Sequence, residues 1–262
     1  MSEYEPVRAI TRGIAILQAI NRSGGLAMSD IAAASGVPYP TAFRIVQTLL
    51  GEGLIEREPA RKVYRPTALV QTLSNGYQED RRLVTAARPH IVELTTKHGW
   101  PVTIATHIGH RMVIRDSTHA LTSLTFNNYY PGYTMPILDC AVGRAFLAYT
   151  SEEEQARIMS SLRVLPSLTE RHALDMFASG ELGRIIVDEG YAAMGNNKFT
   201  QNPGKTSSIA VPLFEDGDVV GALALVFFSS AMRMNEAVPR YLQDIQATAG
   251  RINETLKQTP KD

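Results

Sequence analysis

The sequence contains a single cysteine, Cys140, so the chain cannot form a disulfide within itself. A reducing compartment such as the cytoplasm is therefore expected. The longest apolar run, residues 219–228, is about half the length that a membrane-spanning helix needs. The acidic start at residues 1–5 also lacks the basic and apolar segments of a secretion signal. We therefore expect no membrane partner.

The chain also has no net charge, because 26 basic side chains balance 26 acidic ones, and this alone argues against a nucleic-acid partner. The charge is unevenly distributed, however. Residues 7–66 carry eight basic and four acidic side chains, and the rest of the chain is close to neutral. A length of 262 residues is enough for two domains. These observations predict a basic contact domain joined to a nearly neutral one.

The first 66 residues have the pattern of three helices followed by a hairpin. Apolar residues at positions 10, 14, 17 and 20 predict a helix that ends before Gly24, and shorter helices are expected at 29–35 and 40–50. Two strand-like runs follow at 54–57 and 62–65. A helix-turn-helix needs small and apolar residues where its helices cross and a glycine in its turn. That set is supplied by Ile31, Ala32, Gly36, Val37, Ala42 and Ile45.

If those positions are buried, the opposite side of the third helix is available for a DNA major groove. That side carries Tyr39, Thr41, Arg44, Gln47 and Thr48. Arg44 suits guanine and Gln47 suits adenine, because each can form two hydrogen bonds to the base. Phosphate contacts are expected from Ser29, Arg57, Arg61, Lys62 and Tyr64. The alternative is a three-helix interaction module whose polar face is only solvated.

The remainder of the chain predicts an α+β domain, in which helices cover an antiparallel sheet. A helical pattern with breaks at 75–76 and at Pro89 covers residues 67–99. Strands are expected at 102–108, 111–116, 133–138, 207–214 and 219–228, and helices at 140–149, 152–162, 171–189 and 236–256. We divide the chain into a winged helix-turn-helix domain at 1–66, a linker helix at 67–82 and an effector-binding domain at 83–262.

Several stretches resemble the IclR family of transcriptional regulators. In the first domain these are residues 8–17, the turn from Asp30 to Pro38 and the pattern from Thr41 to Gly53. In the second they are 87–90, 140–148, 190–191, 209–213 and 220–223. The resemblance implies a GAF/PAS-like effector domain and a homodimer or dimer of dimers. It also implies that the protein binds double-stranded operator DNA and a small-molecule carboxylic acid, with RNA polymerase as a further partner.

Three stretches bear on how this chain differs within the family. Residues 64–67 and 115–119 are most similar to the branch of activators for hydroxyphenylpropionate and related aromatic-acid catabolism. Tyr39 and Pro40 stand where the family more often has a small polar residue, so the start of the recognition helix is expected to contact DNA differently.

The start of the helix at Cys140 is the expected place for an acid, because it leaves backbone N–H groups free. Asp139 as the helix's own N-cap is the competing interpretation. In the family that this chain resembles, the glyoxylate-responsive members hold their acid with serines on a late strand. This chain has Ala224 and Val226 at the matching positions. An apolar cavity for an aromatic or aryl-alkanoic acid is therefore expected, with glyoxylate or pyruvate as the alternative. The expected lining residues are His107, Met135, Cys140, Ala141, Val142, Met194, Asn196, Ser208, Ala224 and Val226, with Arg115 as carboxylate partner.

No nucleophile–base pair, set of metal ligands or cofactor loop emerges from the sequence. We therefore predict no catalytic residue, metal or cofactor, and a ligand-responsive regulator of a catabolic operon. An enzyme fused to a small docking module is the rival from another class.

Overall fold

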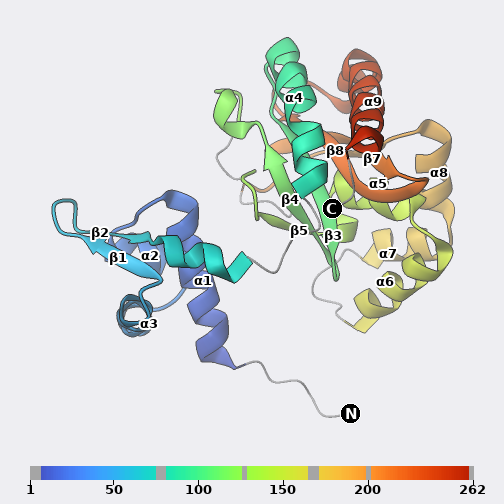
Figure 1. The fold of residues 1–262 in the computed structure, drawn as a ribbon. Helices are drawn as coiled ribbons and strands as arrows, with labels where there is room; N and C mark the ends of the chain where they lie inside the picture. The colour runs from blue at the N-terminus through green and yellow to red at the C-terminus, as the bar shows by residue number, and fades with distance from the viewer. Residues whose placement is uncertain (1–6, 75–80, 126–128, 165–170, 199–201, 260–262) are drawn as a thin grey trace. The chain divides into compact units, whose positions relative to one another are not determined.

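The computed structural model describes residues 7–74, 81–125, 129–164, 171–198 and 202–259 of the chain (Figure 1). The chain divides into two compact units, residues 1–78 and 79–262. Part of the predicted linker helix, residues 75–80, lies outside the described residues. In its described part a 3-10 helix, η1, spans Ala68–Ser74.

The first unit contains three helices and a two-stranded hairpin, as expected. These are α1 (Arg8–Ser23), α2 (Met28–Ser35), α3 (Tyr39–Gly51), β1 (Ile55–Glu58) and β2 (Val63–Pro66). Gly36 ends α2 with a φ of 66°, a left-handed conformation that glycine adopts without steric cost. The turn between α2 and α3 is therefore short, as a helix-turn-helix requires.

A single apolar cluster holds these elements together. Fully buried isoleucines from α1 and α2 meet the small side chain of Ala42 and that of Val46 on α3. The hairpin joins the same cluster through Tyr64, whose backbone N–H and C=O both pair with Leu26, at 2.8 and 3.0 Å. The core therefore fixes which side of α3 faces outward.

The second unit is built on a six-stranded antiparallel sheet in the order β5-β4-β3-β8-β7-β6. Its strands are β3 (Val102–Ile108), β4 (Arg111–Ser117), β5 (Thr134–Pro136), β6 (Ala192–Met194), β7 (Thr206–Glu215) and β8 (Asp218–Phe228). Short 3-10 helices follow β4 and β5, at η2 (His119–Leu121) and η3 (Ile137–Asp139).

Helices cover both faces of this sheet. On one face, α4 (Arg81–His98) and α9 (Met234–Gln258) lie side by side (Figure 1). On the other, α5 (Ala141–Tyr149) packs across β7 and β8, with α8 (Glu181–Glu189) beside it. The outer helices on this side are α6 (Glu152–Val164) and α7 (Arg171–Ala178). We call these two sides the α4 face and the α5 face.

The two faces differ in the size of their side chains. The α4 face carries large apolar residues such as Leu225 and Phe227. The α5 face carries alanines that pair across the strands: Ala105 is opposite Ala222, and Ala210 is opposite Ala224. Small side chains at these positions let α5 lie close to the sheet.

An arginine ties the beginning of the second unit to its end. Arg82, in the first turn of α4, pairs with Glu215 at the end of β7 at 2.8 Å. It also donates to the carbonyls of Leu256 and Thr259 at the C-terminal end of α9, at 3.2 and 2.7 Å. Three elements distant in the sequence thus meet at one side chain.

Two predictions about secondary structure are wrong, and one strand was not predicted. Pro89 lies within α4 and does not break it, because buried neighbours on both sides, including Ala87 and Ile91, hold the helix on the sheet. The single helix predicted at 171–189 is two helices, since Gly180 adopts a φ of 74° between α7 and α8. The short strand β6 was not predicted, because its pairing with β7 is not local in the sequence.

None of the helices in the described ranges is both long enough and apolar enough to cross a membrane.

The close packing of Gly143 in α5 against the backbone of η3 yields a stability prediction. A Cβ atom added at Gly143 would lie 1.9 Å from the carbonyl oxygen of Ile137, so α5 would have to shift. We expect Gly143→Ala to lower the free energy of unfolding by about 3 kcal/mol, as overpacked cores do. Urea titration of the full chain, followed by circular dichroism, measures this change.

Gly183→Ala in α8 is the matched control, because nothing lies within 4 Å of the added Cβ. It should leave stability unchanged or raise it by up to about 1 kcal/mol, owing to the better helix propensity of alanine. Equal midpoints for Gly143→Ala and the wild type would contradict the close packing of α5.

Candidate DNA interface and effector site

The outward side of α3 is the first candidate site. Ala42 and Val46 are buried in the core, and Thr41 is half-buried, so these residues face inward. The exposed residues recur at helical spacing and form one continuous face: Tyr39, Pro40, Phe43, Arg44, Gln47, Thr48 and Gly51. The structure therefore brings together all the predicted α3 contacts except the half-buried Thr41.

Arg44 and Gln47, the predicted base readers, are one turn apart on this face. Both are exposed, and Arg44 forms no ion pair with any described residue, so its guanidinium is available to a ligand. The Thr48 hydroxyl donates to the Arg44 carbonyl at 3.1 Å, which leaves its oxygen as an acceptor. Ser29 is exposed in the first turn of α2, where its Oγ donates weakly to Asp30 Oδ1 at 3.4 Å.

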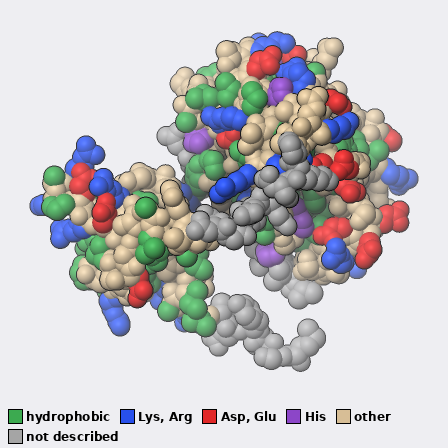
Figure 2. All heavy atoms as spheres, viewed as in Figure 1, with side chains coloured by type: hydrophobic (Ala, Val, Ile, Leu, Met, Phe, Trp, Pro, Cys, Tyr) green, Lys and Arg blue, Asp and Glu red, His purple; other side chains and the backbone are tan. Residues whose placement is uncertain are grey.

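The hairpin carries mixed charges, and Figure 2 shows basic and acidic side chains intermingled on it. Arg65 pairs with Glu56 at 2.7 Å, and that hydrogen bond together with the charge of Glu56 and Glu58 raises the pKa of the Arg65 guanidinium. Arg61 pairs with Glu58 at 3.6 Å.

Arg57 and Lys62 are both exposed, and neither has an ion-pair partner among the residues that the structure describes. These two cations are therefore better placed for phosphate contacts than Arg61.

The prediction for Tyr64 is wrong. It was predicted to contact phosphate, but it is only 5% exposed and its ring belongs to the core of the first unit. Its position between Leu26 and Arg57 in the hairpin register turns it inward. Tyr64 anchors the hairpin and is not one of the candidate contacts.

The second candidate site lies on the α5 face. Strand alternation places predicted residues from β5, β6, β7 and β8 on this side, where they meet the first turn of α5. These residues are Met135, Met194, Ser208, Ala224, Val226, Cys140, Ala141 and Val142. His107 also points to this side and stacks on Phe146 of α5, with ring centroids 5.1 Å apart. Burial lowers the pKa of His107, which favours its neutral form.

Arg115, predicted as the carboxylate partner, faces the wrong side of the sheet. The register of β3 and β4 slips between Ile104 and Ala105, which makes Arg115 the extra residue of a β-bulge. Its Nε donates to Thr106 Oγ1 at 2.7 Å, and Thr106 lies beside Leu83 of α4. Arg115 therefore belongs to the α4 face. Asn196 is also displaced from the site, because it is exposed in the turn after β6, with a φ of 50°.

Cys140 occupies the N-cap position of α5, and no side chain caps this helix. Asp139, the competing cap, is buried one residue earlier in the η3 turn. Burial raises the pKa of the Cys140 thiol to about 12 and Asp139 adds to the effect, whereas Arg144 and Arg111 oppose it. These two arginines are the cations near the start of α5 that the sequence analysis missed. The Arg144 Nε donates to the Leu138 carbonyl at 2.8 Å, which fixes its position.

A narrow cavity without room for a water molecule adjoins this site at the end of strands β3, β7 and β8. Val226 lines it together with aromatic side chains, including Tyr129 and Phe227. The Tyr129 hydroxyl is 2.8 Å from Thr206 Oγ1, and burial raises the pKa of Tyr129 to about 12, so the phenol stays protonated. The cavity is thus apolar and aromatic, with one neutral polar pair.

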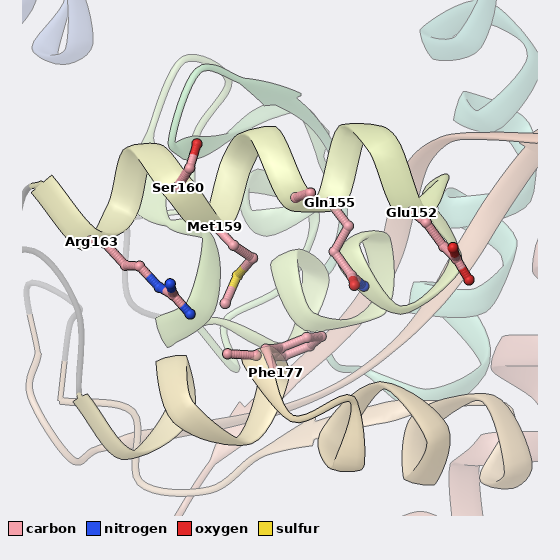
Figure 3. A pocket seen from close by; sticks show the side chains of 8 residues that line it. Glu152, Gln155, Met159, Ser160, Arg163 and Phe177 are labelled. Atoms are coloured by element: carbon pink, nitrogen blue, oxygen red, sulfur yellow. The ribbon is translucent and has the colours of Figure 1, made fainter.

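A separate groove of about 270 Å³ lies between α6 and α7. Figure 3 shows Gln155 and Met159 of α6 pointing toward Phe177 of α7. The Gln155 amide already donates to the Leu147 carbonyl at 2.8 Å. None of the predicted effector residues lines this groove.

Comparison with known proteins finds family matches in both units of the chain. Residues 9–59 match the IclR helix-turn-helix domain, and residues 76–254 match the bacterial transcriptional regulator IclR C-terminal domain. The HTH-type transcriptional regulator Rv1719 of Mycobacterium tuberculosis is 30% identical over 70% of this chain and 69% of its own length. The transcriptional repressor IclR of Escherichia coli is 25% identical over 58% of this chain, and the match spans 57% of that repressor.

Among solved structures, an IclR homolog from Microbacterium hydrocarbonoxydans in complex with 4-hydroxybenzoate has the same fold. Its TM-score is 0.63 at 20% identity, and the match covers 96% of this chain and 100% of that one. The helix-turn-helix unit followed by an antiparallel-sheet domain is therefore the fold of IclR proteins. On the family matches over both units, the chain belongs to the IclR family of transcriptional regulators.

Proposed function

We propose that this protein binds double-stranded operator DNA through α3 and the β1–β2 hairpin. We further propose that it controls a catabolic operon in response to an aromatic or aryl-alkanoic carboxylic acid bound on the α5 face. The observation that carries the DNA-binding part is the exposed face of α3, where Arg44 and Gln47 stand on a helix whose other side is fixed in the core. Arg57 and Lys62 would add phosphate contacts from the hairpin.

The effector class is inferred from the chemistry of the α5 face. Its apolar side chains and the aromatic wall of the adjoining cavity suit an aromatic ring. The uncapped start of α5, with Arg144 and Arg111 near it, suits a carboxylate, although the buried Asp139 opposes one. The complex of the Microbacterium homolog with 4-hydroxybenzoate supports the same class.

One observation favours the alternative, a small 2-oxo acid such as glyoxylate or pyruvate. The cavity beside Val226 has no room for a water molecule, so a ligand that enters it must displace side chains, and a smaller acid displaces fewer of them. An aromatic acid would require the side chains around Val226 to move apart, whereas pyruvate would need less movement.

We also propose that the protein acts as a homodimer or a dimer of dimers. Val7, which precedes α1, forms an exposed apolar stripe with Ile10 and Ile14 of that helix, and Leu69 and Leu73 of η1 are exposed as well. Such a stripe suits a second copy of the chain, and a dimer matches operators with two half-sites. Residues 67–82 would link the DNA-binding domain at 1–66 to the effector domain at 83–262.

A protein that contacts operator DNA works in the cytoplasm, and we propose that compartment. The position of the operator relative to the promoter would decide whether the bound protein blocks RNA polymerase or contacts it.

The DNA-binding face is tested by replacing its two base readers. We expect Arg44→Ala and Gln47→Ala each to weaken selective binding about 5- to 150-fold, because each contact is worth about 1–3 kcal/mol. The assay is a mobility shift at fixed salt with duplexes from the intergenic DNA upstream of the gene. Arg184→Ala, which removes an exposed arginine of α8, should leave affinity unchanged. Wild-type affinity and selectivity in both α3 variants would refute the assignment.

The effector class is tested by calorimetric titration of the full chain. We expect heat of binding with 4-hydroxybenzoate and 3-(4-hydroxyphenyl)propionate, because the α5 face offers an apolar surface and one cationic end. Glyoxylate and pyruvate serve as the comparison set and should give none. Binding of only these two small acids would replace the proposed class by its alternative.

The pairing surface is tested by placing a charge in the α1 stripe. Ile14→Glu should weaken operator binding about tenfold or more, because burial of such a side chain is worth about 1.5–3 kcal/mol. Val187→Glu on α8, at a similarly exposed valine, is the control and should have no effect. Unchanged sedimentation and unchanged DNA affinity for Ile14→Glu would rule out α1 as the interface.

A further inference from the structure

Two aromatic side chains stand out on the DNA-facing side of α3. Tyr39 is 52% exposed and Phe43 is 43% exposed. Of the phenylalanine, tyrosine and tryptophan side chains in the described ranges, only these two are exposed. They lie one turn apart, and Gln47 continues the same row a further turn along the helix. We call this line of side chains the outer row of α3: Tyr39, Phe43 and Gln47.

Apolar side chains on an amphipathic helix usually pack in the core, but Phe43 of α3 does not. The core of the first unit takes Ala42 and Val46 from α3, and Phe43 is not part of it. Burial of a phenylalanine side chain is worth about 1.5–3 kcal/mol, so an exposed phenyl ring forgoes that gain. An exposed apolar pair beside Arg44 and Gln47 therefore indicates a surface that a partner covers.

The major groove offers one apolar group for such a ring to contact. Among the base edges, only thymine carries a methyl group there, at C5. Gln47 in the same row suits adenine, the partner of thymine in the base pair. One helical turn advances about 5.4 Å and one base-pair step about 3.4 Å, so neighbouring members of the row would reach bases one or two steps apart.

We propose that Phe43 is a specificity-determining residue that packs on thymine C5 methyl groups, with Tyr39 beside it. The inference rests on the proposed DNA-binding function and deepens it. The operator half-site then holds thymines next to the base pair that Gln47 reads, and Arg44 in the neighbouring row reads a guanine. Selectivity at the thymines comes from apolar contact and not from a hydrogen bond.

The test removes the methyl group without changing base pairing. Operator duplexes, located by footprinting in the upstream intergenic DNA, are prepared with single thymines replaced by deoxyuridine. For the wild-type full chain, we expect an effect at one or two thymine positions of each half-site. A single replacement at such a position should weaken binding about fourfold, the effect of losing one buried methyl group.

The coupling between the methyl group and the ring is the decisive measurement. In Phe43→Ala the same replacements should change affinity by less than about 1.5-fold, while Phe43→Leu should keep part of the effect because it remains apolar. Ile185→Ala, at an isoleucine of α8 that is 42% exposed and lies outside both candidate sites, should show the full wild-type response. Circular dichroism of the variants checks that they are folded.

Each outcome has a definite meaning. If the wild type binds its operator selectively but no deoxyuridine replacement weakens binding, or if the loss persists in Phe43→Ala, the inference is overturned and the proposed function stands. If the wild type ignores every duplex at low salt, the DNA-binding function itself fails, and this inference fails with it.

Discussion

The contact on which the DNA-binding unit depends is the packing of α3 against the isoleucines of α1 and α2. Ala42 is fully buried at this crossing, so its methyl group sets how closely the helices approach, and Val46 repeats the contact one turn later. Because two positions one turn apart are fixed, the rotation of α3 about its axis is fixed as well. The polar and aromatic side chains are then left outward by geometry, without hydrogen bonds among themselves to hold them there.

The effector domain uses the two sides of its sheet differently. Large side chains on the α4 face fill the space beneath two long helices and give this layer its stability. Paired alanines on the α5 face leave room for a helix that begins uncapped and lies close against the carbonyl of Ile137. The α5 face, which has the smaller side chains, also carries most of the predicted effector residues. A ligand bound there would fill space that the alanine side chains of the sheet leave open.

Local pattern was sufficient to predict the order of elements in the DNA-binding unit and the inward side of α3. It was also sufficient for the residues of the α5 face, because strand alternation carries side-chain direction over long distances. The prediction for Arg115 is wrong on the same principle: Ile114 packs on the α5 face, so strand alternation turns the next residue, Arg115, to the α4 face. Local pattern failed for Tyr64, because its ring is amphipathic and only the packing of the whole unit decides whether it is buried. Pro89 shows that tertiary burial can outweigh a local helix-breaking preference.

Arg82 has a mechanical consequence for signalling between the units. Its side chain joins the β7–β8 hairpin, the last turn of α9 and the first turn of α4, and α4 begins where the polypeptide enters the larger unit. A ligand that displaced β7 or β8 would shift Glu215 and so act on this junction through the Arg82 side chain. The first turn of α4 would then respond to a change at the sheet directly, without that change passing along the body of the helix.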